Sequence, residues 1–144
     1  MIQQISVLLE NRKGRLAELA RALGDADINM HALTTADTAD FGVIRIIADH
    51  PARAAEILRN RDFTVALTDV VAVEAPHRPG GLADILDTLE AIGADVEYSY
   101  VFVAPGMGAA DILRVDHPDA EDALARAGFA VLGPKDLYAP DALD

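Results

Sequence analysis

Residues 9–16, with the sequence Leu-Glu-Asn-Arg-Lys-Gly-Arg-Leu, predict a polar turn between an alternating apolar run and an amphipathic helical run. A strand that turns straight into a helix leaves the first backbone N–H groups of the helix without partners, and such a helix start favours a carboxylate. The Asn11 side chain offers both a donor and an acceptor, and Gly14 has no side chain to block a close approach. This stretch therefore predicts a site for the head group of a small zwitterion.

The turn occurs twice in the chain. Residues 75–82 read Ala-Pro-His-Arg-Pro-Gly-Gly-Leu, with Arg, Gly and Leu at the same spacings as in residues 9–16. The triplet Asp-His-Pro also occurs twice, at 49–51 and at 116–118. Matched signals at nearly equal separations, 66 residues for the turn and 67 for the triplet, indicate one module built twice.

Each half of the chain predicts the order strand, helix, strand, strand, helix, strand. In the first half these elements are expected at 4–9, 16–26, 27–35, 41–48, 51–59 and 63–67, with a loop at 34–40. In the second half they are expected at 71–75, 82–92, from 95 onward, 110–115, 120–127 and 129–132. The order predicts an α+β fold of two ferredoxin-like βαββαβ repeats, with antiparallel sheets and helices on one face. We expect one domain at 1–68, a second at 69–133 and a C-terminal tail at 134–144.

Composition narrows the class of function. The 144 residues carry 24 acidic and 12 basic side chains, for a net charge of −12, which argues against nucleic acid or an anionic membrane as partner. The absence of Cys excludes disulfides, thiolate metal sites and a Cys nucleophile. No basic leader or long apolar run is present, so a cytoplasmic location is expected. No catalytic motif is found, so we expect no enzyme activity, no metal and no cofactor.

Two groups of residues carry a family resemblance. They are the turn Asn11–Leu16 with Asp27–Met30, and the turn Arg78–Leu82 with Ala94–Glu97. Together with the element order, they resemble the ACT domain, a small regulatory module that binds amino acids. The resemblance covers residues 1–133 as two domains in tandem. The second copy keeps the Arg-Pro-Gly turn of the family, whereas the first has Lys13 where Pro is usual.

The resemblance implies a ligand between the turn of one domain and the second strand of a neighbouring domain. In serine-binding members, side-chain amides at these two places hold the amino acid, and they correspond here to Asn11 and Asn29. The implied positions of the first repeat are Asn11, Lys13, Gly14, Arg15, Leu16, Ile28, Asn29 and Met30. Those of the second are His77, Pro79, Gly80, Gly81, Leu82, Val96, Glu97 and Tyr98. Because His77 and Glu97 replace the two amides, an identical second site is not implied.

Simpler roles remain open for several of these residues. Asn11 is also suited to a local turn bond or a helix cap. Arg12 and Arg78 are either carboxylate forks or ordinary surface arginines. His31 is expected to be partly buried and neutral, and Tyr98 suits a pocket or a dimer seam.

Three functions are compatible with the sequence. The first is a homodimeric, non-catalytic sensor that binds a free amino acid and regulates a partner enzyme of amino-acid metabolism. The second is a regulatory subunit of the acetolactate synthase small-subunit type, which acts through contact with its partner. The third is a small enzyme on the same ferredoxin-like plan, because a fold does not fix a function.

Overall fold

The computed structural model describes residues 1–37, 40–104, 106 and 108–142. The chain divides into two compact units. The first unit contains Gln3–Thr68 together with the C-terminal segment from Tyr138, and the second contains Met1–Ile2 together with Asp69–Leu137. No helix in the described residues is long and apolar enough to cross a membrane.

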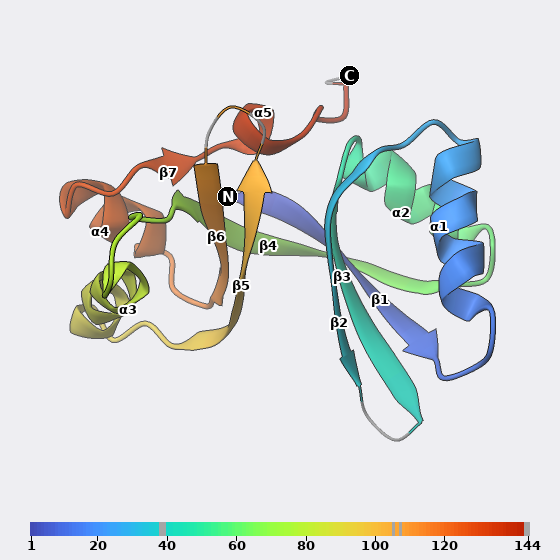
Figure 1. The fold of residues 1–144 in the computed structure, drawn as a ribbon, viewed down its shortest axis with the longest axis horizontal. Coiled ribbons are helices and arrows are strands. Elements are labelled where there is room, and N and C mark those ends of the chain that lie inside the picture. The colour runs from blue at the N-terminus through green and yellow to red at the C-terminus, as the bar shows by residue number, and fades with distance from the viewer. Residues whose placement is uncertain (38–39, 105, 107, 143–144) are drawn as a thin grey trace. The chain divides into compact units, whose positions relative to one another are not determined.

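The first unit is a βαββαβ module. Its elements are β1 (Ile2–Glu10), α1 (Arg15–Asp25), β2 (Met30–Asp37), β3 (Phe41–Ala48), α2 (Pro51–Arg59) and the first part of β4 (Thr64–Glu74). Its strand order is β2-β3-β1-β4, and β3 pairs antiparallel with both β1 and β2. Figure 1 shows α1 and α2 on the same side of these strands.

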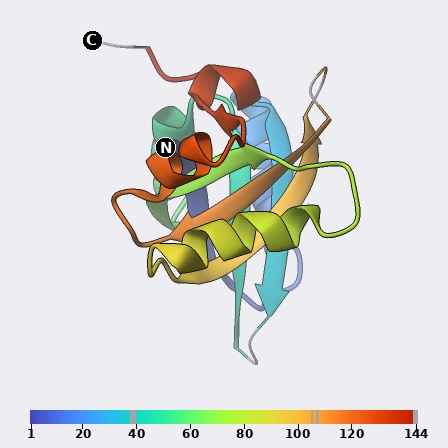
Figure 2. The same ribbon diagram turned by 90° about the vertical axis from the view of Figure 1, so that its left-hand side faces the viewer.

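The second unit repeats this plan. Its elements are the remainder of β4, α3 (Gly81–Ala91), β5 (Val96–Ala104), β6 (Gly108–Val115), α4 (Ala120–Arg126) and β7 (Val131–Leu132), followed by α5 (Pro134–Leu137). The strand order is β5-β6-β4-β7, with β6 antiparallel to β4 and β5 and with β7 antiparallel to β4. Figure 2 shows α3 and α4 in front of this sheet. Both units order their strands second, third, first, fourth, which confirms the predicted α+β class of two ferredoxin-like repeats.

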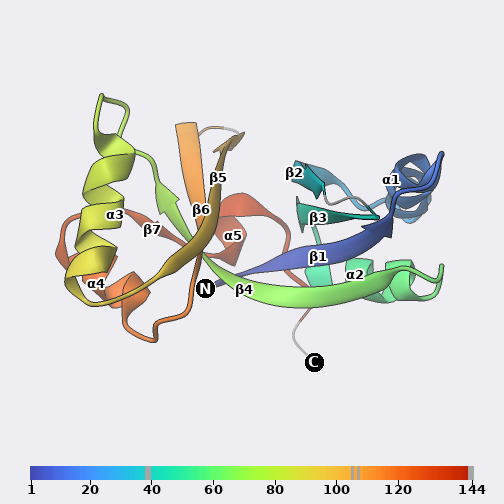
Figure 3. The same ribbon diagram turned by 90° about the horizontal axis from the view of Figure 1, so that it is seen from below.

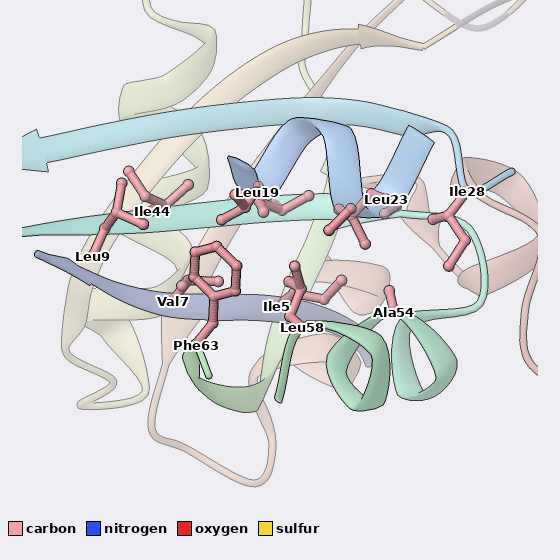
Figure 4. Close-up of a cluster of buried hydrophobic side chains, with 13 residues drawn as sticks. Ile5, Val7, Leu9, Leu19, Leu23, Ile28, Ile44, Ala54, Leu58 and Phe63 are labelled. Carbon is pink, nitrogen blue, oxygen red and sulfur yellow. The ribbon is translucent and has the colours of Figure 1, made fainter. Parts of the chain in front are cut away.

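Each unit buries an apolar cluster between its sheet and its helices. Residues two apart on a strand, or three or four apart on a helix, share a face. Apolar residues at these spacings therefore form one apolar face on each strand and helix, and these faces pack against one another. In the first unit, Figure 4 shows this cluster: Ile5, Val7, Leu9, Leu19, Ala22, Leu23, Ile28, Ile44, Ile46, Ala48, Ala54, Leu58 and Phe63. The cluster of the second unit contains Val71, Val73, Ile85, Leu89, Leu113, Val115, Ala120 and Leu124.

Several strands differ from the sequence expectation. The strand predicted from Asp27 begins at Met30, and the strand predicted at 129–132 is only Val131–Leu132. The strands predicted at 63–67 and 71–75 form one continuous strand, β4, which Figure 3 draws as a single long ribbon. The loop predicted at 34–40 begins later, because β2 continues to Asp37 in register with Gly42 of β3. Within that expected loop, Thr38 and Ala39 lie outside the described residues.

The helices and the C-terminus also differ in part. Leu16 and Leu82, predicted as the first members of buried stripes, are both 42% exposed. The buried faces of α1 and α3 begin instead at the preceding residues, Arg15 and Gly81. The helices α2 and α4 begin at Pro51 and Ala120, both as expected. The segment after Gly133, expected as a tail, begins with the short helix α5. Two of its side chains are buried, those of Leu137 and Tyr138.

Candidate functional site

Backbone hydrogen bonds fix the turn between β1 and α1. The N–H of Asn11 donates to the carbonyl of Asp40 (3.2 Å), and the N–H of Arg15 donates to the carbonyl of Arg12 (3.2 Å). Gly14 has φ +85°, a left-handed conformation that L side chains rarely adopt. The sequence signal of a Gly at this position therefore reflects a backbone requirement.

The start of α1 offers free donors. No side chain caps the helix at Gly14. Among the described residues, no acceptor is found for the backbone N–H groups of Leu16 and Ala17, which belong to the first helical turn. Such groups, together with the positive end of the helix dipole, attract an anion.

A pocket of about 380 Å³ opens beside this helix start. Its apolar wall is made by Leu9, Leu16, Ala17 and Ile44, and its polar groups come from Glu10, Asn11, Arg12 and Thr35, with Gly14 and Gly42 completing the lining. Three of the predicted ligand residues, Asn11, Gly14 and Leu16, thus meet in one pocket. Sequence reasoning missed the contributions of β2 and β3, which follow from register, because Thr35 pairs with Ile44.

Arg12 and Arg15 have different surroundings. Arg12 makes no ion pair with any residue in the described part of the chain. The side chain of Arg15 is only 7% exposed and donates to Glu18 Oε2 (2.9 Å) and to the carbonyl of Asp62 (3.0 Å). Its guanidinium lies 3.8 Å from the centre of the Phe63 ring. Neither Arg15 nor Lys13, both predicted ligand residues, lines the pocket.

The second turn, between β4 and α3, has the same backbone conformation as the first, but its arginine forms an ion pair. Gly80 has φ +82°, matching Gly14. Gly81 occupies the position of Arg15, and a Cβ there would collide with the carbonyl of Pro76. Without an arginine at that position, Asp84, the counterpart of Glu18, pairs with Arg78. The turn arginine of the second repeat is therefore engaged, and that of the first is not. The remaining predicted residues of this turn, His77, Pro79 and Leu82, are exposed.

The predicted second-strand residues lie at the other end of each sheet. The carbonyl of Asn29 accepts from the N–H of Asp49, just past the end of β3, whereas Asn11 contacts Asp40, just before its start. Eight residues of strand between them correspond to roughly 25 Å. Ile28 and Met30 flank Asn29, with Ile28 in the core and Met30 packed against it. One unit therefore does not bring Asn11 and Asn29 together.

The same separation holds in the second unit. Val96, Glu97 and Tyr98 lie where β5 begins, and β5 pairs antiparallel with β6 from Val96 opposite Val115. The turn at His77 lies at the opposite end, where Ala75 donates to the carbonyl of Ala109. Glu97 already has a cationic neighbour, since its carboxylate lies 3.7 Å from Nε of Arg114.

Two acidic side chains have shifted pKa values. Burial raises the pKa of Asp49, but hydrogen bonds from the N–H of Ala139 (2.7 Å) and with His31 (2.8 Å) outweigh burial, so its pKa is lowered. Burial alone raises the pKa of Asp111. The described residues contain no cluster of His, Asp and Glu suited to a metal ion.

Comparison with known proteins agrees with this architecture. The crystal structure of a protein from Bacteroides thetaiotaomicron is similar, with 37% identity, a TM-score of 0.85 and 93% of each chain covered. The ligand-free regulatory subunit of aspartate kinase from Thermus thermophilus shares the fold, with 17% identity, a TM-score of 0.63, and 87% of this chain and 89% of that chain covered. A search of curated proteins gave no match. The family model described as an ACT domain pair matches residues 1–133, so this chain belongs to the ACT family as a pair of ACT domains.

Proposed function

We propose that this chain is a regulatory protein that binds a free amino acid in the pocket at the first turn. The observation that carries the proposal is the unpaired Arg12 beside the uncapped start of α1, in a pocket with one apolar wall. Arg12 and the N–H groups of Leu16 and Ala17 serve the ligand carboxylate. Glu10, whose carboxylate also lies 3.7 Å from the guanidinium of Arg15, serves its ammonium group. Leu9, Leu16 and Ile44 receive the side chain of the ligand.

The first repeat suits this role better than the second. A guanidinium that already pairs with a carboxylate must give up that partner before it binds another. Asp84 occupies Arg78 in the second repeat, whereas Glu18 is held by Arg15 in the first, which leaves Arg12 available. We therefore propose one amino acid per chain.

Asn29 takes part through a second copy of the chain. Because Asn29 lies at the far end of its own sheet, it meets a ligand at the Asn11 turn only if the turn belongs to a neighbouring domain. We propose a homodimer in which Asn29 of one copy contacts the ligand at Asn11 of the other. The ligand then stabilises one arrangement of the dimer, by as much as its affinity differs between arrangements.

The chain then regulates an enzyme of amino-acid metabolism by direct contact with it. The regulatory subunits of aspartate kinase, which share this fold, support such a role. A second observation favours partner contact: Val101 and Val103 on β5, at the edge of its sheet, are 55% and 76% exposed. Exposed apolar side chains on an edge strand invite pairing with another protein.

A thermal-shift screen against the standard amino acids, followed by calorimetry on each hit, tests the proposal. Binding to the folded state raises the melting temperature. We expect one selective ligand, and we expect Arg12→Ala to weaken its affinity about tenfold or more, the loss of one charge-assisted hydrogen bond. Arg78→Ala removes the same charge from the second turn and is expected to leave the affinity unchanged.

Two results would contradict the proposal. If Arg12→Ala and Arg78→Ala weakened binding equally, the ligand would not be confined to the first turn. If no amino acid raised the melting temperature at millimolar concentration while a large enzyme co-purified with the chain, the partner-subunit alternative would replace the sensor.

A further inference from the structure

A second pocket lies on the other side of the first turn of α1. It has a volume of about 330 Å³ and is lined by Gly14, Ala17, Glu18, Arg21, Arg61 and Phe63. It shares only Gly14 and Ala17 with the pocket proposed for the amino acid. Its other residues come from one face of α1 and from the turn between α2 and β4, so it is a separate site.

This pocket is positively charged in a strongly acidic protein. Arg21 and Arg61 both line it, and neither side chain has an ion-pair or hydrogen-bond partner within the residues that the structure describes. Glu18, the only acid in the lining, is paired with Arg15 at 2.9 Å. The whole chain has a net charge of −12, so a pocket lined by two unpaired guanidinium groups is locally positive in an acidic protein.

The turn that carries Arg61 is fixed against α1. Arg15 donates to the carbonyl of Asp62 (3.0 Å) and stacks on Phe63, which is 6% exposed. Asp62 has φ +66°, a left-handed conformation that is uncommon for a residue other than glycine. The backbone N–H groups of Arg61 and Asp62 donate to Leu58 and Arg59. Arg61 is therefore presented by a rigid support, at some conformational cost.

The second repeat provides an internal comparison. It keeps the frame of this pocket, with Gly80, Ala83 and Phe129 in place of Gly14, Ala17 and Phe63. It lacks the charges: Gly81, Asp87 and Ala127 stand in place of Arg15, Arg21 and Arg61, and Gly128 replaces the strained Asp62. The shared frame is what the fold requires. The left-handed turn is common to both repeats, since Gly128 has φ +92°. Arg21 and Arg61 belong to the first repeat alone, and no contact among the described residues gives either side chain a structural role.

We propose that this pocket is a second ligand site, for a small doubly charged oxyanion such as a phosphate group. Two guanidinium forks, those of Arg21 and Arg61, bind such a group through charge-assisted hydrogen bonds. The site uses neither Arg12 nor Asn11, so variants of those residues test the two sites separately. Because both pockets share Gly14 and Ala17, an oxyanion bound here lies against the same helical turn as the amino acid.

Titration of the whole protein with inorganic phosphate, followed by NMR of the backbone amides at constant ionic strength, tests this site. We expect saturable shifts at Ala17, Glu18 and Arg21 and at the turn that carries Arg61. Arg61→Ala and Arg21→Ala should each weaken phosphate binding at least tenfold. Succinate distinguishes the chemistry, since equal binding would assign the site to doubly charged oxyanions in general.

Two control variants separate the alternatives. Arg53→Ala removes an exposed arginine from α2 and should not change phosphate binding. Arg12→Ala should weaken amino-acid binding but leave phosphate binding intact, so the two proposals fail separately. The oxyanion site would be overturned if the shifts failed to saturate. It would also be overturned if Arg53→Ala weakened phosphate binding as much as Arg61→Ala and Arg21→Ala, with all variants folded by circular dichroism.

Discussion

Asp111 is a buried carboxylate that lowers the folding stability of the second unit. It is 2% exposed, and its Oδ2 has no hydrogen-bond partner among the described residues. It lies on β6 opposite Val73 of β4, two residues from Leu113 in the apolar cluster. Counted from the two Asp-His-Pro triplets, its counterpart in the first repeat is Ile44, which suits such a position. A buried carboxylate without a partner is unfavourable.

We expect Asp111→Asn to stabilise the protein at pH 7 by an amount on the order of 1 kcal/mol, because it removes the charge and keeps the shape. Burial raises the folded-state pKa of Asp111 above its unfolded value. The penalty is therefore absent below the unfolded pKa of about 3.9 and grows as the pH rises through the folded pKa. Urea unfolding between about pH 4 and pH 8 measures this difference. Asp116→Asn, an exposed neighbour, is the control, and a gain that did not depend on pH would refute the explanation.

At the scale of elements, the C-terminal segment completes helix α2. His50 at the start of α2 provides no side-chain cap, and Pro51 has no N–H. The carboxylate of Asp141 accepts from the N–H groups of Ala52 (2.8 Å) and Arg53 (3.1 Å). The carbonyl of Ala139 accepts in turn from the N–H of His50. Residues distant in sequence thus provide the cap that the helix lacks locally.

Asp141→Ala is expected to destabilise the first unit by about 0.5–2 kcal/mol, the usual effect of removing a helix cap. The effect should be local, with faster amide exchange at Ala52 and Arg53 and little change in α1. Hydrogen exchange read by NMR measures it residue by residue. Asp95→Ala removes an exposed carboxylate elsewhere and serves as control. Equal exchange in both variants would mean that Asp141 does not cap α2.

Strands and helix starts were predictable from the sequence where a local pattern of residues determines them. Alternation predicted β1, a run dense in β-branched residues predicted β3, and Pro51 predicted the start of α2. The continuity of β4 was not predictable, because the polar residues Thr68 and Asp69 are typical of a break between domains. The first pocket was found only in part, through Asn11, Gly14 and Leu16. The second was missed because Arg61 reaches α1 only in the folded unit, although comparing Arg15, Arg21 and Arg61 with Gly81, Asp87 and Ala127 would have singled them out.

At the scale of the whole molecule, the separation of Asn11 from Asn29 leads to a test of the proposed assembly. If each ligand contacts Asn11 of one copy and Asn29 of the other, a symmetric dimer holds two such sites related by its twofold axis. Asn11→Ala and Asn29→Ala should then each weaken amino-acid binding when studied alone. Both substitutions are at exposed positions, so neither is expected to affect folding.

Mixing the two variants distinguishes a shared site from two independent effects. In a mixed dimer, one site carries both substitutions and the other carries neither. Random exchange makes about half of the dimers mixed, so about a quarter of all sites should regain full affinity. Calorimetry of the equilibrated mixture should therefore detect a tight class of sites that neither variant has by itself. If both variants bind weakly and their mixture recovers no tight sites, the two residues do not meet at one ligand across a dimer.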